Sequence, residues 1–231
     1  MPPGDAATSP AVPSRARYNR IIRFATAVMF QAWWFEIALP RIGLRRVAER
    51  SRARRLQRIA ARFRVLAVDL GGLMIKVGQF LSARLDVLPP EVTSELEQLQ
   101  DEVPAVAFSQ IRALAEAELG VPLDRACAWF DEVPVAAASL GQAHRARLAD
   151  SDEQISGFAE VVVKVQRPGI DRIVETDLAA LRTIGARLSR IGFVADRVDA
   201  PALVEEFAAT SREEIDYLHE GVNAERFAET F

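Results

Sequence analysis

Residues 161–169 read VVVKVQRPG, and the single lysine inside this apolar run guides the interpretation of the whole sequence. The valines favour a β-strand, and Pro168-Gly169 ends it in a turn. The chain has 29 basic residues, but only Lys164 and Lys76 are lysine. A lysine ammonium is a compact charge on a thin stem, whereas an arginine guanidinium is a planar fork. We therefore expect Lys76 and Lys164 to lie where a compact charge is required.

Two β-prone stretches precede this strand, CAWFDEVP (127–134) and SLGQAHRARL (139–148). The small-residue run PVAAAS (134–139) is expected to join them as a turn, and residues 149–158 to form the turn before the third strand. Small residues let backbone amides approach phosphates, and a lysine on a neighbouring strand can reach the same phosphates. The pattern favours a nucleotide site, because a half-buried lone lysine needs an anion. The alternative is a surface lysine on an edge strand.

Helical patterns surround these strands and complete the expected fold. They cover residues 65–87, 91–101, 108–119, 169–191 and 201–231, the last being open to a bend. Helices followed by antiparallel strands and further helices predict an α+β fold.

The composition restricts the classes of protein that the chain can belong to. Half of the 231 residues are hydrophobic, which excludes a globally disordered chain. One cysteine, Cys127, excludes an internal disulfide, and two histidines leave little for a zinc site. Charge is unevenly divided: residues 1–64 carry fourteen arginines and three acids, whereas residues 65–231 carry fifteen basic residues and 29 acids. A basic front on an acidic body indicates that the front alone meets an anionic surface.

The basic front has its own organisation. Residues 1–17 are rich in proline, alanine and serine and predict a disordered lead. Residues 18–64 predict basic amphipathic helices, whose charge-free run Phe24–Phe35 is shorter than the ~20 residues that cross a bilayer. With Trp33-Trp34, this pattern favours a peripheral membrane anchor. Three alternatives are helices packed on the body, an arginine-rich RNA-binding segment, and an organelle transit peptide.

Four stretches carry a family resemblance. They are LMIKVGQFLSAR (73–84), VPVAAASLGQAH (133–144), VVVKVQRPGI (161–170) and EEIDYLHEGVNAERF (213–227). In order and spacing they resemble the Lys-x-Gly-Gln signature, the alanine-rich nucleotide loop, the lysine strand and the Glu-x-Asp stretch of the UbiB/ADCK family of atypical protein-kinase-like proteins. The resemblance covers residues 65–231, and the first 60 residues match only loosely.

The resemblance implies a division of the chain and roles for particular residues. Residues 65–126 would be a helical extension with the Lys-x-Gly-Gln motif, and residues 127–231 a partial kinase-like N-lobe. Lys164 would hold the α- and β-phosphates of a nucleotide and pair with Glu220. The nucleotide loop would consist of Ala136, Ala137, Ala138 and Ser139.

The resemblance also implies catalytic residues over the cleft in which a protein kinase would receive its peptide. Lys76 and Gln79 would cover this cleft, together with Glu214 and Asp216 of the Glu-x-Asp stretch, and Lys76 would contact Glu214. Helical spacing does place Lys76 and Gln79 on one face. Spacing alone gives no preference for Glu214 over Glu213.

The family resemblance also implies function. It suggests that the whole protein binds ATP or ADP with Mg²⁺, hydrolyses ATP or transfers its phosphate, and supports isoprenoid quinone (ubiquinone) biosynthesis. It would be membrane-associated, on the cytoplasmic face in a bacterium or in an organelle. Expected partners are adenine nucleotide, a membrane lipid or quinone precursor, and quinone-biosynthesis proteins, but no nucleic acid.

Catalytic elements of a kinase are missing from these 231 residues. They contain no His-x-Asp run and no Asp-Phe-Gly. We therefore expect the chain to be the front portion of a longer protein or a catalytically dead truncated product, with metal ligands beyond its end and none within it. Two further alternatives are a non-catalytic lipid-binding pseudokinase scaffold and a helical membrane-interaction protein without nucleotide.

Overall fold

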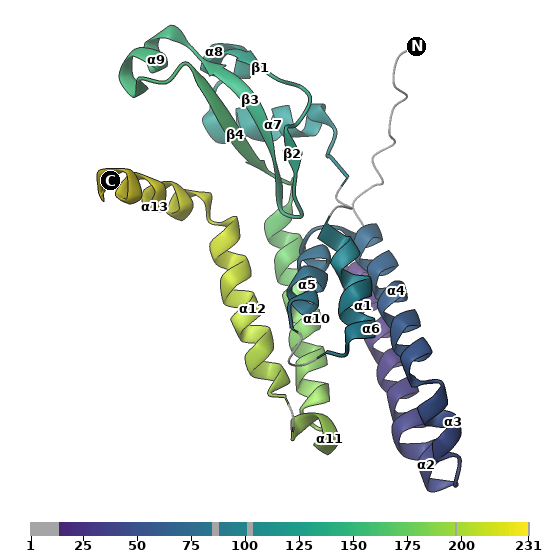
Figure 1. The fold of residues 1–231 in the computed structure, drawn as a ribbon. Helices are drawn as coiled ribbons and strands as arrows, with labels where there is room; N and C mark the ends of the chain where they lie inside the picture. The colour runs from purple at the N-terminus through teal and green to yellow at the C-terminus, as the bar shows by residue number, and fades with distance from the viewer. Residues whose placement is uncertain (1–13, 85–87, 101–103, 197, 231) are drawn as a thin grey trace, which may run out of the picture. The chain divides into compact units, whose positions relative to one another are not determined.

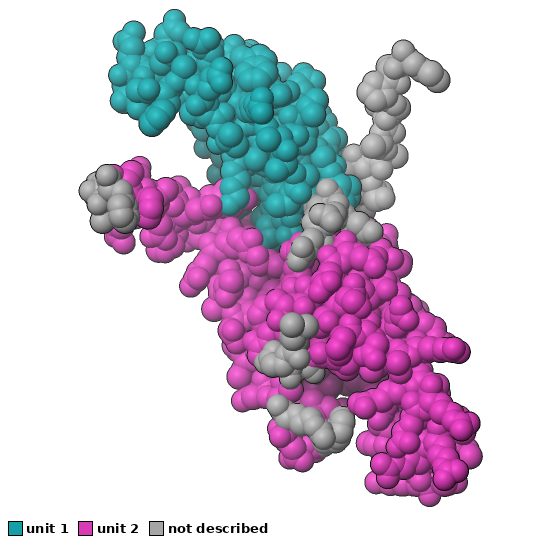
Figure 2. Space-filling view, viewed as in Figure 1, with its two compact units in different colours: residues 1–11, 103–170 teal, residues 12–102, 171–231 magenta. Residues whose placement is uncertain are grey.

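The computed structural model of the chain describes residues 14–84, 88–100, 104–196 and 198–230. It confirms the α+β class, with many helices and one antiparallel sheet (Figure 1). The chain divides into two compact units, which Figure 2 shows in different colours. Of the described residues, 104–170 form the sheet unit, and those within 14–100 and 171–230 form the helical unit.

The sheet unit consists of four strands and three short or medium helices. Its elements are α7 (Phe108–Leu119), α8 (Leu123–Ala126), β1 (Cys127–Phe130), β2 (Ala136–Ala137), β3 (Gly141–Leu148), α9 (Asp150–Ser156) and β4 (Glu160–Gln166). All pairings are antiparallel and all involve β3, which pairs with β1, β2 and β4. Helix α7, which the expected boundary at 126 assigns to the helical extension, lies in this unit with the sheet.

Two expectations for this region are corrected. The run predicted as a turn contains a fourth strand, because Ala136 and Ala137 pair with Ala143 and Gln142 of β3. The predicted turn at 149–158 contains helix α9. Three acids in the first turn of α9 favour its amino end, and Gly157, with φ of 75°, ends it in the left-handed conformation that glycine adopts readily.

One face of the sheet forms the core of this unit. Ile111 and Ala115 of α7 pack with Leu123 and Val165. A buried polar network crosses the same region, because the Gln142 side chain contacts the His144 ring at 2.9 Å and bonds to the backbone of Val106. The other ring nitrogen of His144 lies 2.8 Å from the carbonyl oxygen of Asp131. Through these bonds the network holds Gln142 and His144, at the start of β3, to the backbone of Val106 and Asp131.

The helical unit is built from long helices joined by short ones. Its elements are α1 (Ser14–Ala32), the π-helix η1 (Trp33–Ala38), α2 (Leu39–Arg41), α3 (Arg45–Arg50), α4 (Arg52–Leu70), α5 (Leu73–Ser82), α6 (Pro90–Glu97), the 3₁₀ turn η2 (Gln98–Gln100), α10 (Ile170–Leu188), α11 (Gly192–Ala195), α12 (Ala200–Ile215) and α13 (Tyr217–Thr230). Helices α4, α5 and α6 pack on one another, and α12 packs on α5. Phe80 of α5 packs against Phe207 of α12 with ring centroids 5.3 Å apart and the rings tilted by 53°.

The helix expected at 65–87 is two helices with a break between them. Helix α4 ends at Leu70 and α5 begins at Leu73. Gly71 and Gly72 separate them with φ of 63° and 58°, which other residues rarely adopt. Residues 85–87 lie outside the described residues. The break lets α5 take a direction different from α4 while both remain packed against α6.

Arg17 holds this break in place. Its guanidinium donates to both carboxylate oxygens of Asp177 in α10 at 2.6 Å, to the carbonyl oxygen of Leu70 at 2.6 Å and to that of Gly71 at 2.9 Å. Arg17 is 3% exposed and Asp177 is fully buried. The expectation of a disordered lead over 1–17 is therefore wrong for residues 14–17, which are helical, and its remainder lies outside the described residues.

The Arg17–Asp177 pair is electrostatically interdependent. Burial raises the pKa of Asp177, and the hydrogen bond and charge of Arg17 oppose this rise. A buried carboxylate without a cationic partner is costly, so Arg17 and Asp177 each depend on the charge of the other. The guanidinium in turn stabilises carbonyls at the negative end of α4.

Two other helices depart from expectation in detail. The acidic helix expected at 91–101 is α6 followed by the turn η2, and residue 101 lies outside the described residues. The long final helix is divided at Asp216, which ends α12 and precedes α13. The Asp216 side chain accepts a hydrogen bond from the His219 amide at 2.9 Å and so caps the start of α13.

Replacing Arg17 with methionine should lower the free energy of unfolding by about 3–5 kcal/mol, because a buried carboxylate loses its partner. Urea unfolding at neutral pH measures the loss. The matched control is Arg20→Met, also on α1, whose pair with Asp69 is exposed; its loss should stay below about 1 kcal/mol. Equal losses in the two variants would contradict the role given to Arg17.

Candidate functional site

Lys164 lies on the face of the sheet opposite to α7. Along β4 the odd-numbered Val161, Val163 and Val165 are partly or fully buried, whereas Val162 and Lys164 are exposed. The expectation of a half-buried lysine is therefore wrong. The strand alternates strictly, so its valines cover the core and its lysine faces away.

The alanine run and Lys164 share one row across the sheet. Ala136 of β2 pairs with Ala143 of β3, and Ala143 pairs with Lys164 of β4. Directly paired residues point to the same face, and two strand spacings of about 4.8 Å separate the ends of the row. The Lys164 ammonium therefore lies on the same face of the sheet as the small side chains of Ala143 and Ala136, which occupy little space on that face.

A tight turn closes the row at one end. The Ala138 amide donates to the carbonyl oxygen of Gly141 at 2.8 Å, so residues 138–141 form the hairpin between β2 and β3. Ser139 is 7% exposed and therefore does not face solvent in this turn. Every described residue with positive φ is a glycine, so the alanines of the run have ordinary negative φ.

Arg167 holds this turn from the end of β4, and sequence analysis missed it. Its side chain donates to the carbonyl oxygens of Ala138 at 3.0 Å and Pro104 at 2.7 Å. Its amide donates to the carbonyl oxygen of Leu140 at 3.0 Å. Burial lowers the pKa of Arg167. The available signal was an arginine directly before Pro168-Gly169, at the point where the lysine strand ends.

The second lysine lies in the helical unit, on α5. Lys76 forms an ion pair with Glu214 in the last turn of α12. The side chain of Lys76 is 20% exposed and that of Glu214 is 41% exposed. The contact expected from the family resemblance is thus present, and it distinguishes Glu214 from Glu213, which spacing alone did not.

The glycine and glutamine of the same motif contact the turn η2. A Cβ built on Gly78 would lie 2.1 Å from Leu99 Cδ1 and 3.2 Å from Phe63 Cε1. The Gln79 side chain donates to the carbonyl oxygen of Leu99 at 3.4 Å. Gly78 therefore permits close packing of η2 on α5, and Gln79 bonds across the same contact.

The remaining predicted residues lie around the break between α12 and α13. Asp216 caps α13, and Glu220 is exposed in its first turn. Burial, with a smaller effect of the Glu220 charge, raises the pKa of Tyr217. The expected pairing of Lys164 with Glu220 joins residues of different units and stays a prediction.

Comparison with known proteins supplies the family. A model described as the ABC1 atypical kinase-like domain matches residues 98–231. The probable protein kinase UbiB of Azotobacter vinelandii is 39% identical over 180 residues, covering 78% of this chain. The chain belongs to the UbiB/ADCK family. The chloroplastic ACTIVITY OF BC1 COMPLEX KINASE 7 of Arabidopsis thaliana is also 39% identical, over 183 residues and 79% of this chain.

This UbiB/ADCK chain spans 32% of the Azotobacter relative and 25% of the Arabidopsis relative. A solved structure, the Rv3197–erythromycin complex from Mycobacterium tuberculosis, is 29% identical to this chain and gives a TM-score of 0.43. The match covers 73% of this chain and 41% of the solved chain. Among the described residues, no group of three histidines, cysteines or acids could hold a metal ion.

Replacing Gly78 with alanine should destabilise the helical unit, although alanine ordinarily stabilises a helix. The added methyl must displace buried Leu99, and overpacking of this kind costs about 1–3 kcal/mol. Thermal unfolding measures the change, and Leu99→Val should restore part of the loss.

The matched control is Gly221→Ala in α13, where nothing lies within 4 Å of an added Cβ. It should leave stability unchanged or raise it by up to about 1 kcal/mol. If Gly78→Ala behaves like this control, close packing does not explain the motif glycine.

Proposed function

We propose that the full protein binds an adenine nucleotide with Mg²⁺ and hydrolyses ATP or transfers its phosphate, in support of isoprenoid quinone biosynthesis at a membrane. The observation that carries the proposal is the row of Ala136, Ala143 and Lys164 beside the turn at 138–141. An exposed ammonium beside small methyl side chains suits the charge and bulk of a polyphosphate. The relatives named as probable protein kinases support phosphoryl chemistry.

The chain's own residues would bind and orient the nucleotide. Lys164 would bond to the phosphates, and Arg167 would keep the alanine turn in place through its bonds to Ala138 and Pro104. Magnesium would neutralise phosphate charge when bound. Since the described residues contain no cluster that fits a metal ion, we assign no magnesium ligand to them.

The Lys76–Glu214 pair is proposed to fix the position of α12 on the Lys-x-Gly-Gln helix α5. Gln79 would act with it by bonding to η2. Asp216 lies between this pair and α13, which carries Glu220. The four residues would in this way connect the motif helix to the glutamate expected at the nucleotide.

A non-catalytic lipid-binding scaffold is the second candidate function. The observation that favours it is the group of exposed tryptophans in the helical unit. In that case nucleotide would bind without being consumed. ATP turnover by the full-length protein separates the two candidates.

Lys164→Met should weaken binding of ATP with Mg²⁺ by roughly tenfold to hundredfold, because a charge-assisted hydrogen bond contributes about 1.5–3 kcal/mol. Isothermal titration of the full-length protein measures the affinity. Arg125→Met, which removes an exposed charge from α8 in the same unit, serves as the control and should bind normally. Equal affinities in both variants would remove Lys164 from the site.

Ala137→Gly should change the preference between ATP and ADP. Alanine restricts the run to negative φ, and glycine would admit the positive φ with which backbone amides wrap around phosphates. Titration of parent and variant with both nucleotides tests this directly. If the variant binds ATP and ADP with the same affinities as the parent, the alanine at position 137 does not restrict how the loop binds phosphates.

A further inference from the structure

Residues 30–55, which we call the hairpin tip, join α1 to α4 through η1, α2 and α3 at one end of the helical unit (Figure 1). The tip exposes an unusual set of large apolar side chains. They are Phe30, Trp33, Trp34, Ile42, Leu44 and Val47, with exposed fractions between 44% and 66%. Phe30, Trp33 and Trp34 follow one another with ring centroids 5.9 Å and 6.2 Å apart.

The tip is also strongly basic. It contains seven arginines and two glutamates, a net charge of +5 in a chain whose net charge is -3. Both glutamates are paired with arginine: Glu49 with Arg45 at 2.7 Å, and Glu36 with Arg55 at 3.1 Å and Arg52 at 3.8 Å. The negative charge of the tip is thus already neutralised within it.

Four other tip arginines point to an external anion. Within the described part of the chain, the side chains of Arg41, Arg46, Arg50 and Arg54 form no hydrogen bond or ion pair, and all four are exposed. Of these four, Arg46 lines a hollow of about 630 Å³. Its lining consists of Gly43, Leu44, Arg45, Arg46, Val47 and Glu49.

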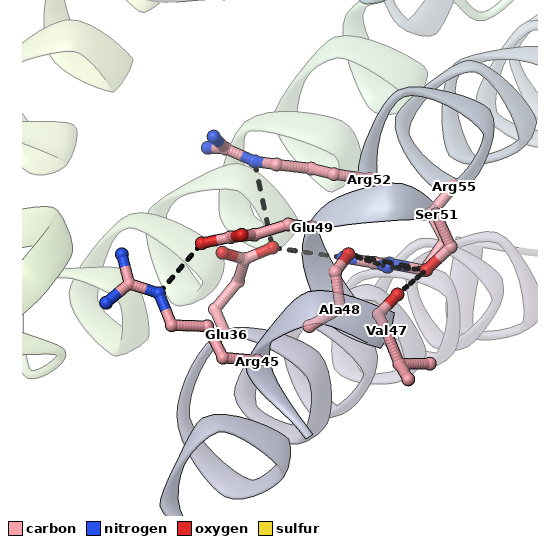
Figure 3. A network of polar contacts seen from close by, with 8 residues as sticks. All are labelled: Glu36, Arg45, Val47, Ala48, Glu49, Ser51, Arg52 and Arg55. Carbon is pink, nitrogen blue, oxygen red and sulfur yellow. Dashed lines mark hydrogen bonds and ion pairs between the residues drawn. The ribbon is translucent and has the colours of Figure 1, made fainter. Parts of the chain in front are cut away.

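Buried contacts make the tip a preformed surface (Figure 3). The Arg55 guanidinium, 6% exposed, donates to the Ala48 carbonyl oxygen at 2.7 Å and to Ser51 Oγ, and lies 4.0 Å from the Phe35 ring centre. The Ser51 hydroxyl donates to the Val47 carbonyl oxygen at 2.9 Å. These bonds join η1, α3 and α4, so little ordering is needed when the surface binds.

We propose that the hairpin tip docks on the surface of a bilayer that contains anionic phospholipid. Trp33, Trp34 and Phe30 would lie at the level of the headgroups, where aromatic rings are favoured. Arg46, which lines the hollow, and the exposed Arg41 would bond to lipid phosphates. None of the described helices is long and apolar enough to cross a membrane, so the contact is with the surface.

Charge and apolar exposure together favour this occupant over the others. A second copy paired tip to tip would bring the same positive charge against the tip, and a nucleic acid would not require the isoleucine, leucine and valine exposed between the arginines. The inference deepens the membrane part of the proposed function and involves no residue of the nucleotide site.

The test is flotation of the 231-residue chain with vesicles, without nucleotide. The chain should float with vesicles of phosphatidylcholine and phosphatidylglycerol and much less with phosphatidylcholine alone. Arg41→Gln with Arg46→Gln should lower partition into the anionic vesicles about thirtyfold. The matched control, Arg172→Gln with Arg190→Gln, removes two exposed arginines of the same unit outside the tip and should leave partition unchanged.

Tryptophan fluorescence tests the aromatic contact. The chain has three tryptophans, so Trp129→Phe leaves only Trp33 and Trp34. Their emission should shift to the blue and be quenched by bromine-labelled lipid. No quenching, or equal flotation of the tip and control variants, overturns the proposal. It is also overturned if the tip variants change oligomeric state in sedimentation without changing flotation, because the surface then belongs to a second copy.

If the full-length protein binds nucleotide normally but the chain does not float with anionic vesicles, only the proposal for the hairpin tip is rejected. If the chain floats as expected but the full-length protein does not bind nucleotide, only the proposal for the nucleotide site is rejected. The two proposals are therefore tested separately.

Discussion

The buried ion pair between Arg17 and Asp177 is the constraint on which the helical unit depends. It joins the first helix to α10, 160 residues later, and its remaining donors bind carbonyls at the glycine break between α4 and α5. That break sets the direction of α5, and α5 carries Lys76, Gly78 and Gln79. A contact made by none of the motif residues thus helps to fix where the motif lies.

The two lysine sites use their charge in different ways. Lys76 is partly buried and engages a carboxylate of its own chain, so its ammonium joins two helices. Lys164 is exposed in a row with Ala136 and Ala143 on the face of the sheet opposite to α7.

Local patterns predicted the fold class, helix α7 at 108–119 and the lysine strand, because these depend on neighbouring residues. The sequence order of four motifs predicted the family and the Lys76–Glu214 contact. The contact of Arg17 with Asp177 could not be predicted, since Asp177 is distant in sequence and an amino-terminal arginine after a proline-rich lead indicates disorder. The exposure of Lys164 was missed because four valines suggest burial on both faces, whereas only alternate positions of β4 face the core.

The rarity of lysine gives the chain an unusual chemical property. Amine acylation can reach only the amino terminus and two side chains, and both of these belong to family motifs. Glu214 shields Lys76, whereas Lys164 stands exposed on β4. An acetyl group on either lysine would remove its positive charge without altering any arginine, so acetylation of a side-chain amine would act on the motif helix α5 or on strand β4.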